Sequence, residues 1–203
     1  MTSHLRKGAL AAIDPRTGAE LTTWAFQYNP ETLIRQILPI RPGGEKEQQP
    51  GASRPGDPPC EEVYLGFELD AADDLERGKP GAAGLGLLPV LSALELLVDR
   101  APGGWERTAG GEQDGVGTPL LLFAWGEHRR APVRIAACTI TEEAFDADLV
   151  PIRARIELAL QVLTYGDSPT SHPGRRLFRE YLQARDRLAT LYRPPSGAIT
   201  QRP

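Results

Sequence analysis

Two carboxylate clusters come nearest to chemistry in this sequence. They consist of Asp70, Asp73, Asp74 and Glu76 in the segment DAADDLE, and of Glu142, Glu143, Asp146 and Asp148 in the segment EEAFDAD. Paired carboxylates can perform acid–base catalysis, and a cluster of them can hold Ca²⁺. Neither cluster has the regular oxygen spacing and the turn glycine of an EF-hand loop. We therefore predict that both are solvated strand ends and turns.

The other residue types that carry chemistry are scattered. His4, His128 and His172 are isolated in polar or loop segments, and no spacing of metal ligands surrounds them. Ser92 lies in LSALE and not on an elbow of the G-x-S-x-G kind. The glycines of GAAGLG, residues Gly81 to Gly86, lack the spacing of a dinucleotide-binding loop. The sequence thus predicts no catalytic, cofactor-binding or metal site, and no enzyme.

The two cysteines, Cys60 and Cys138, are too few for a disulfide framework. Cys60 follows a proline-rich segment, and Cys138 lies inside a strand-like run. We expect a loop thiol and a small buried hydrophobic residue, with a single disulfide between them as the alternative.

Composition limits the class of protein. The 203 residues suffice for one large domain, and 40% of them are hydrophobic. A net charge of −4 argues against nucleic-acid binding, which requires a basic surface. The first residues, MTSHLRKGALAAI, lack the apolar core of a secretory signal, and no stretch approaches the ~18 apolar residues of a membrane span. We expect synthesis and assembly in the cytoplasm without membrane insertion.

The elements that must position these residues are mainly strands. Alternating apolar and polar residues predict six or seven mostly antiparallel strands. They are expected at Arg6–Asp14, Glu20–Phe26, Thr32–Ile40, Glu61–Asp70, Thr118–Gly126, Ala131–Phe145 and Pro151–Tyr165.

The last of these strands has the clearest pattern, a period of two held for more than ten residues. Its apolar face consists of Ile152, Ala154, Ile156, Leu158, Leu160 and Val162, and its polar face of Arg153, Arg155, Glu157 and Gln161. A charged face of this length fits a barrel or sheet that is wetted on one side.

A sharp corner is expected near the start of the chain, in the segment WAFQYNPETLIRQ. Asn29 suits a helix N-cap and Pro30 the first helical position, which predicts one helical turn at most between two strands. No side chain of this segment resembles a catalyst, so its role is expected to be structural.

Two helices complete the expected framework. The first spans Gly86–Arg100, with Pro89 in its first turn, and the second spans Gly174–Tyr192. The apolar stripe of the first consists of Val90, Leu91, Leu94, Leu97 and Val98, and that of the second of Phe178, Tyr181, Leu188, Leu191 and Tyr192.

The domain organisation follows from these elements and from composition. Residues 42–59 and 101–117 are too polar and rich in glycine or proline to be ordered by burial, and are predicted to be mobile loops. Residues 1–192 are expected to form one domain and residues 193–203 a tail. The predicted fold class is mainly β (α+β), an antiparallel β-barrel or rolled sandwich with one inserted helix and a C-terminal helix.

Several segments resemble, in order, the contractile injection system tube and baseplate spike–tube adaptor family, whose phage tail-like members often contain a LysM module. The most specific are FQYNPETL (Phe26–Leu33) and ITEEAFDADLVPIRA, within Val133–Tyr165. The remaining similar segments are YLGFELDAAD at Tyr64–Asp73, LLPVLSALELL at Leu87–Leu97 and PLLLFAWG at Pro119–Gly126. Together the similar segments are spread over the chain from Phe26 to Tyr165.

The resemblance implies a tail-tube-like β-barrel that assembles in rings of six. Such a ring is a structural, non-enzymatic layer that connects the spike and baseplate hub to the inner tube. The implied partners are further copies of the chain, a spike protein, a tube or tube-initiator protein and other baseplate proteins. No cofactor, nucleic acid or membrane insertion is implied. The particle is assembled in the cytoplasm and is then released or acts at the cell envelope.

Three alternatives remain open at this point. The chain could be the tube initiator or the inner-tube protein of the same machine. It could be a peptidoglycan-binding or peptidoglycan-cleaving component, although the sequence reaches Pro203 without the LysM module of many relatives. It could also be a stand-alone β-barrel enzyme that uses Glu142, Glu143 and Asp146.

Overall fold

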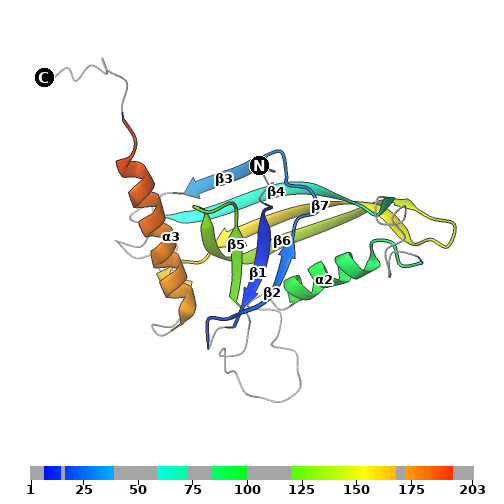
Figure 1. Cartoon of the computed structure of the whole chain (residues 1–203), viewed down its shortest axis with the longest axis horizontal. Helices are drawn as coiled ribbons and strands as arrows, with labels where there is room; N and C mark the ends of the chain where they lie inside the picture. The colour runs from blue at the N-terminus through cyan, green and yellow to red at the C-terminus, as the bar shows by residue number, and fades with distance from the viewer. Residues whose placement is uncertain are drawn as a thin grey trace, which may run out of the picture.

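The computed structural model describes residues 7–14, 17–38, 59–72, 84–99, 120–167 and 172–193. Within these ranges the chain forms one seven-stranded antiparallel sheet, two α-helices and a short 3₁₀ helix, η1, at Tyr165–Asp167 (Figure 1). The strands are β1 (Ala9–Ile13), β2 (Glu20–Ala25), β3 (Leu33–Leu38), β4 (Cys60–Asp70), β5 (Leu120–Ala124), β6 (Arg130–Phe145) and β7 (Pro151–Val162). The helices are α2 (Leu88–Asp99) and α3 (Pro173–Thr190).

The strand order is β2-β1-β5-β6-β7-β4-β3. Sequential strands pair as β1–β2, β3–β4, β5–β6 and β6–β7, while β1–β5 and β4–β7 join segments that are distant in the chain. The predicted mainly β fold is confirmed. Closure into a barrel is not shown, because β2 and β3 are the two ends of the sheet and do not pair within the described residues.

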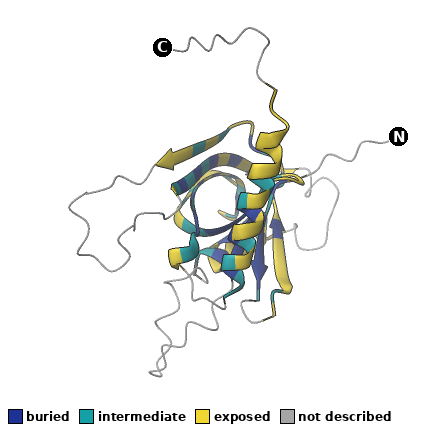
Figure 2. Cartoon of the chain, turned by 90° about the vertical axis from the view of Figure 1, so that its left-hand side faces the viewer, coloured by how far each residue is buried: buried dark blue, intermediate teal, exposed yellow. Residues whose placement is uncertain are grey.

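The open sheet is strongly curved around its core (Figure 2). Residues from opposite halves of the sheet therefore meet inside it. The ring of Trp24, on β2, lies 5.3 Å from that of Phe67, on β4. Phe26, which follows β2 and is fully buried, lies 4.9 Å from Phe67. Aromatic burial of this kind holds the two halves together without a hydrogen-bonded seam.

The two faces of β7 are the ones that alternation predicts. Ala154, Ile156, Leu158, Leu160 and Val162 are buried, and Ile152 packs against them. On the opposite face Arg153, Arg155 and Glu157 are exposed and Gln161 is half-buried. β4 adds its own apolar face of Val63, Leu65, Phe67 and Leu69 to the same core.

The two helices cover different parts of the sheet. The apolar stripe predicted for α2 is confirmed, because Leu91, Leu94 and Leu97 are buried in the main core. A second, smaller cluster lies on the other face of β1 and β5, where Leu177 of α3 packs against it. It consists of Ala11, Ile13, Leu120, Leu122 and Leu163. β5 is thus buried on both faces, as its continuous apolar run predicts.

The predicted apolar stripe of α3 is only half right. Phe178 and Tyr181 are buried, but Leu188, Leu191 and Tyr192 are 45%, 71% and 70% exposed. The helix runs on past the sheet, so its last turn does not pack on the described part of this chain (Figure 1). A helical apolar pattern indicates which face is buried but not what covers each turn.

The predicted helical turn at Asn29 is wrong. The chain passes the corner without a helix, and Asn29 Oδ1 instead accepts a hydrogen bond of 2.8 Å from the backbone N–H of Gly8. The side chain therefore ties the corner to the chain just before β1.

The expected mobile loops at 42–59 and 101–117 and the tail at 193–203 lie outside the described residues, apart from Pro59 and Arg193. The structure therefore leaves those three expectations untested.

The assignment of the two faces of β7 can be checked with one pair of variants. Leu158 is 2% exposed, so Leu158→Ala should lower the free energy of unfolding by ~2–5 kcal/mol. Glu157 lies on the wetted face, and Glu157→Gln should change it by no more than ~0.5 kcal/mol. Chemical denaturation of both variants beside the parent measures the difference. Equal unfolding midpoints would mean that the faces are wrongly assigned.

Candidate functional site

The face of the sheet that points away from the core carries rows of side chains across β3, β4, β7 and β6. In the first row Ile34 lies opposite Tyr64, which lies opposite Ala159, which lies opposite Ala137. The next row consists of Gly66, Glu157 and Thr139, and the one after it of Glu68, Arg155 and Thr141.

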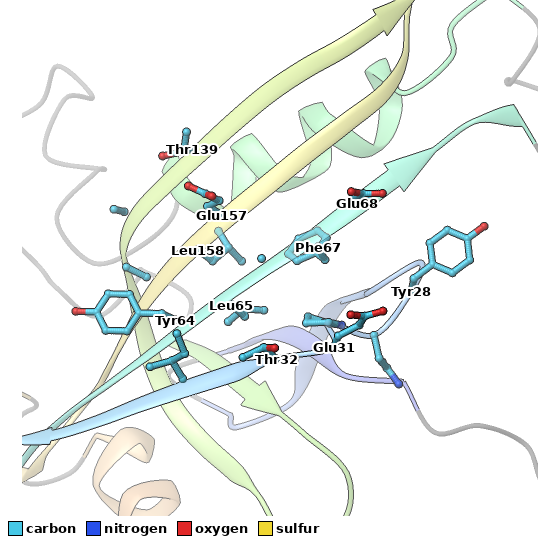
Figure 3. Close-up of a pocket in the computed structure, with 16 residues that line it drawn as sticks. Tyr28, Glu31, Thr32, Tyr64, Leu65, Phe67, Glu68, Thr139, Glu157 and Leu158 are labelled. Carbon is cyan, nitrogen blue, oxygen red and sulfur yellow. The ribbon is translucent and has the colours of Figure 1, made fainter.

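The first two rows, together with Glu68 of the third, form the floor of a groove of about 810 Å³ (Figure 3). One side is formed by the corner between β2 and β3, where Tyr28 is half exposed at 50% and Pro30 is buried. Ile34 lies in the groove with 58% of its surface exposed. The groove is therefore a wetted surface with an apolar patch, and not an internal cavity.

Gly66 explains why the sheet is hollowed at this place. A Cβ added there would meet only the carbonyl oxygen of Ile156, at 3.8 Å. In the adjacent row of the groove floor, Ala159 and Ala137 are small as well. Three positions without large side chains leave space between Tyr64 and Glu68, which stand along β4 on the same face. A glycine inside a strand is typical of a site where another chain or a ligand approaches the backbone.

The groove is acidic. Its sixteen described lining residues include Glu31, Glu68 and Glu157 and no arginine, lysine or histidine. Glu68 lies 3.6 Å from Arg155, which also lies 3.4 Å from Glu143 and so shares its charge between two carboxylates. At the other end of the groove, the Tyr64 hydroxyl donates a hydrogen bond to the carboxylate of Glu62, and this bond raises the pKa of Tyr64. The site thus attracts positive charge beside exposed aromatic and aliphatic side chains.

The corner that forms the side of the groove is fixed by long-range hydrogen bonds. Asn29 accepts from Gly8, as described above. Gln27 donates to the Asp70 carbonyl at 2.7 Å and accepts from the Asp70 N–H at 3.0 Å. These contacts join the corner to the start of β1 and to the end of β4. These side chains therefore position the entry into β3.

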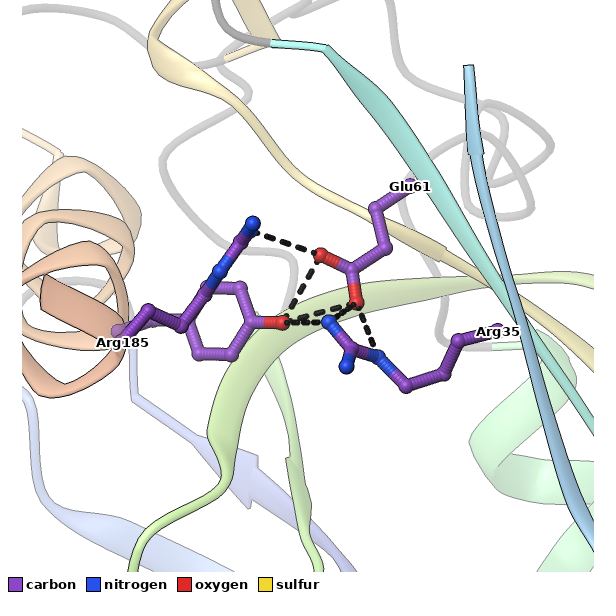
Figure 4. A network of polar contacts seen from close by, with 4 residues as sticks. Arg35, Glu61 and Arg185 are labelled. Atoms are coloured by element: carbon purple, nitrogen blue, oxygen red, sulfur yellow. Dashed lines mark hydrogen bonds and ion pairs between the residues drawn. The ribbon is translucent and has the colours of Figure 1, made fainter. Parts of the chain in front are cut away.

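A buried polar network holds α3 to the same edge of the sheet (Figure 4). Glu61 of β4 is 3% exposed and accepts hydrogen bonds from Arg35 Nε at 2.7 Å and from the Tyr181 hydroxyl at 2.8 Å. Arg185 of α3 lies 3.3 Å from its other oxygen. Burial and the bond to Glu61 raise the pKa of Tyr181. The four side chains satisfy one another, which indicates a structural lock between α3 and the sheet.

The carboxylates that the sequence singled out are engaged locally. Asp70 accepts from the Ala72 N–H at 2.8 Å and pairs with Arg153 at 3.0 Å; the hydrogen bond and the guanidinium lower its pKa. Glu143 pairs with Arg155, and Asp146 accepts from two N–H groups of the β6–β7 turn. The predicted solvated strand ends and turns are confirmed for these residues. Asp73, Asp74 and Glu76 lie outside the described residues.

The remaining candidates do not come together either. His172 caps α3 by accepting from the Gly174 N–H at 3.1 Å, and burial lowers its pKa. His128 and Ser92 are exposed, and His4 lies outside the described ranges. Both cysteines are free thiols, and Cys60 begins β4 and so is not in a loop.

Sequence reasoning missed both the groove and the Glu61 network, although each left a signal. Gly66 interrupts an otherwise good strand pattern. Glu61 occupies the same alternating face as Val63 and Leu65, which is a position for an apolar residue. A charge at such a position requires partners, and here these come from β3 and α3.

Comparison with known proteins adds no relative. No protein-family model matches the chain, and no curated protein matches it. Within the described residues no three potential metal ligands gather, and no helix there is both long and apolar enough to span a membrane. What the fold and site define is an antiparallel, mainly β protein with an acidic groove beside an exposed sheet edge.

The Glu61 network should contribute strongly to stability. Glu61→Gln removes the negative charge and leaves Arg35 and Arg185 partly buried without their partner, so the free energy of unfolding should fall by ~3–5 kcal/mol. Tyr181→Phe keeps the ring and removes one hydroxyl, so its loss should be ~1–2 kcal/mol. Urea denaturation of both variants measures this order. A Glu61→Gln variant as stable as the parent would contradict the structural role.

Gly8 and Gly66 provide a test of packing, because the first is closely surrounded and the second faces the groove. A Cβ at Gly8 would lie 2.6 Å from the ring of Trp125, so Gly8→Ala should cost ~1–3 kcal/mol. Gly66 faces the open groove, and Gly66→Ala should be neutral or slightly stabilising. Thermal melting of the two variants distinguishes them, and a melting temperature lowered equally by both would show that the groove is not open.

Proposed function

We propose that this chain is a structural, non-enzymatic subunit of a phage tail-like contractile injection system, forming a ring that connects the spike and baseplate hub to the inner tube. The observation that carries the proposal is the edge strand β3. Ile34, Ile37 and Leu38 on this strand are 58%, 43% and 45% exposed, and no described strand pairs with its outer edge. The ordered sequence resemblance supplies the class of machine.

An apolar edge of this kind favours pairing between chains. Soluble proteins usually protect sheet edges with lysine, proline or a bulge, and the six residues of β3, LIRQIL, contain neither lysine nor proline. The sheet has a second edge at β2, where Leu21 is 56% exposed. Two different edges that no described strand pairs with suit a head-to-tail contact, which closes into a ring when the rotation permits.

In this proposal the curved sheet acts as a tail-tube-like barrel whose polar face contributes to a channel wall. Two charged residues of β7 support that role, because Arg153 and Arg155 are exposed on a central strand of the sheet. The ring contains six copies, and its neighbours are a spike protein, a tube or tube-initiator protein and other baseplate proteins. The closest alternative is that the chain is the tube-initiator protein or the inner-tube protein of the same machine.

The proposal assigns no reaction to the carboxylates. Glu143 and Asp146 serve an ion pair and a turn, so they support strand geometry and not acid–base catalysis. The subunit assembles in the cytoplasm, and the finished particle is released or acts at the envelope.

The purified chain should form closed rings in negative-stain electron microscopy. Leu38→Lys places a charge on the edge of β3 and should give monomers with an unchanged melting temperature. Leu88→Lys is the matched control, because Leu88 is 42% exposed on α2, away from the edge. Size-exclusion chromatography with light scattering measures the assembly state. Rings that survive Leu38→Lys, or a parent chain that stays monomeric, would contradict the proposal.

A further inference from the structure

We infer that the acidic groove binds the C-terminal end of α3 from a second copy of this chain. The inference rests on the proposed ring and deepens it, because it names the two surfaces through which neighbouring copies recognise each other. The partner surface consists of Arg187, Leu188, Leu191, Tyr192 and Arg193, which we call the α3 end.

The α3 end has the chemistry that the groove requires. Leu188, Leu191 and Tyr192 are 45%, 71% and 70% exposed, although they lie together on one side of the last helical turns. Exposed Arg187 and Arg193 flank this apolar patch. An apolar patch of this kind on an otherwise polar helix indicates a protein contact.

The groove offers the complementary pattern. Its apolar part is provided by Ile34 and by the rings of Tyr28 and Tyr64. Glu31, Glu68 and Glu157 line the same groove between the two tyrosines, and no described lining residue is basic. An apolar patch flanked by two arginines therefore meets a groove that carries three glutamates beside apolar and aromatic side chains. Such opposite charges favour the correct register and suppress other partners.

The contact belongs between copies because α3 is anchored on the core-facing side of β4, whereas the groove opens on the opposite side of that strand. Tyr181 and Arg185 anchor α3 to Glu61, which shares the core-facing side of β4 with Val63 and Leu65. The groove opens on the other side of the same strand, beside Tyr64 and Gly66. One subunit thus presents a groove and a different surface that fits it, which is a head-to-tail contact.

Filling the groove tests the inference without removing any interaction. Gly66→Val adds a side chain where a Cβ meets only ordinary contacts, and valine suits a strand, so the variant should fold at least as well as the parent. Sedimentation velocity measures the dissociation constant for self-association. For this variant it should rise by about tenfold or more, because the added side chain blocks the groove and removes a central contact. Thr141→Val, on the same face but outside the groove, is the control and should associate normally.

Charge reversal tests the pairing itself. Glu157→Lys alone, or Arg187→Glu with Arg193→Glu, should each weaken self-association by about tenfold or more, and the three changes together should restore most of it. Glu95→Lys, an exposed residue on α2, is the control of equal charge change. The parent's association should also weaken between low and high salt.

The outcomes separate this inference from the proposed function. If the parent forms rings and these are affected neither by Gly66→Val nor by charge reversal on one of the two surfaces, the inference is wrong and the ring remains. If the variants abolish association as expected but the parent forms only open chains in electron micrographs, the inference holds and the ring proposal fails. A parent that stays monomeric at all concentrations overturns both.

Discussion

The central position of β7, hydrogen-bonded to β6 on one side and β4 on the other, is the constraint on which the rest of this structure depends. Its alternate residues supply the core, and the intervening residues supply the wetted face. Because side chains alternate with a period of two, a slip of one residue would place Ile156 and Leu158 in water and Arg155 and Glu157 in the core. The cost of that exchange fixes the register of both neighbours.

The same register places the groove. Gly66 and Ala159 come to lie beside Ala137 only because β4, β7 and β6 pair as they do. The corner at Asn29 and the lock at Glu61 then fix the two ends of β3, one through Gly8 and the other through α3. The candidate site is thus a product of strand register and two polar anchors, and it requires no reactive side chain.

Much of this fold could be predicted from the sequence because its strands have a strong local pattern. Period-two alternation predicted strands at β4 and β7 and the two faces of β7. What could not be predicted are the long-range pairings of β1 with β5 and β4 with β7. Local patterns also gave the wrong role to Asn29, whose partner Gly8 is distant in sequence, and to Leu188, whose exposure depends on where the sheet ends. Gly66 and Glu61 were visible as breaks in a pattern, but the groove and the network require the neighbouring strands to be known.

The pairing of β4 with β7 has a consequence for how the chain is made. β3 and β4 leave the ribosome early, yet the strand that completes their core face follows only after α2, β5 and β6. The apolar side of β4, with Val63, Leu65 and Phe67, therefore stays uncovered during much of synthesis. Sheets that depend on such distant contacts fold slowly, and their unpaired edges are prone to aggregate in the meantime. The nascent chain is consequently a natural client for chaperones, and its yield in a foreign host should depend on how quickly translation reaches β7.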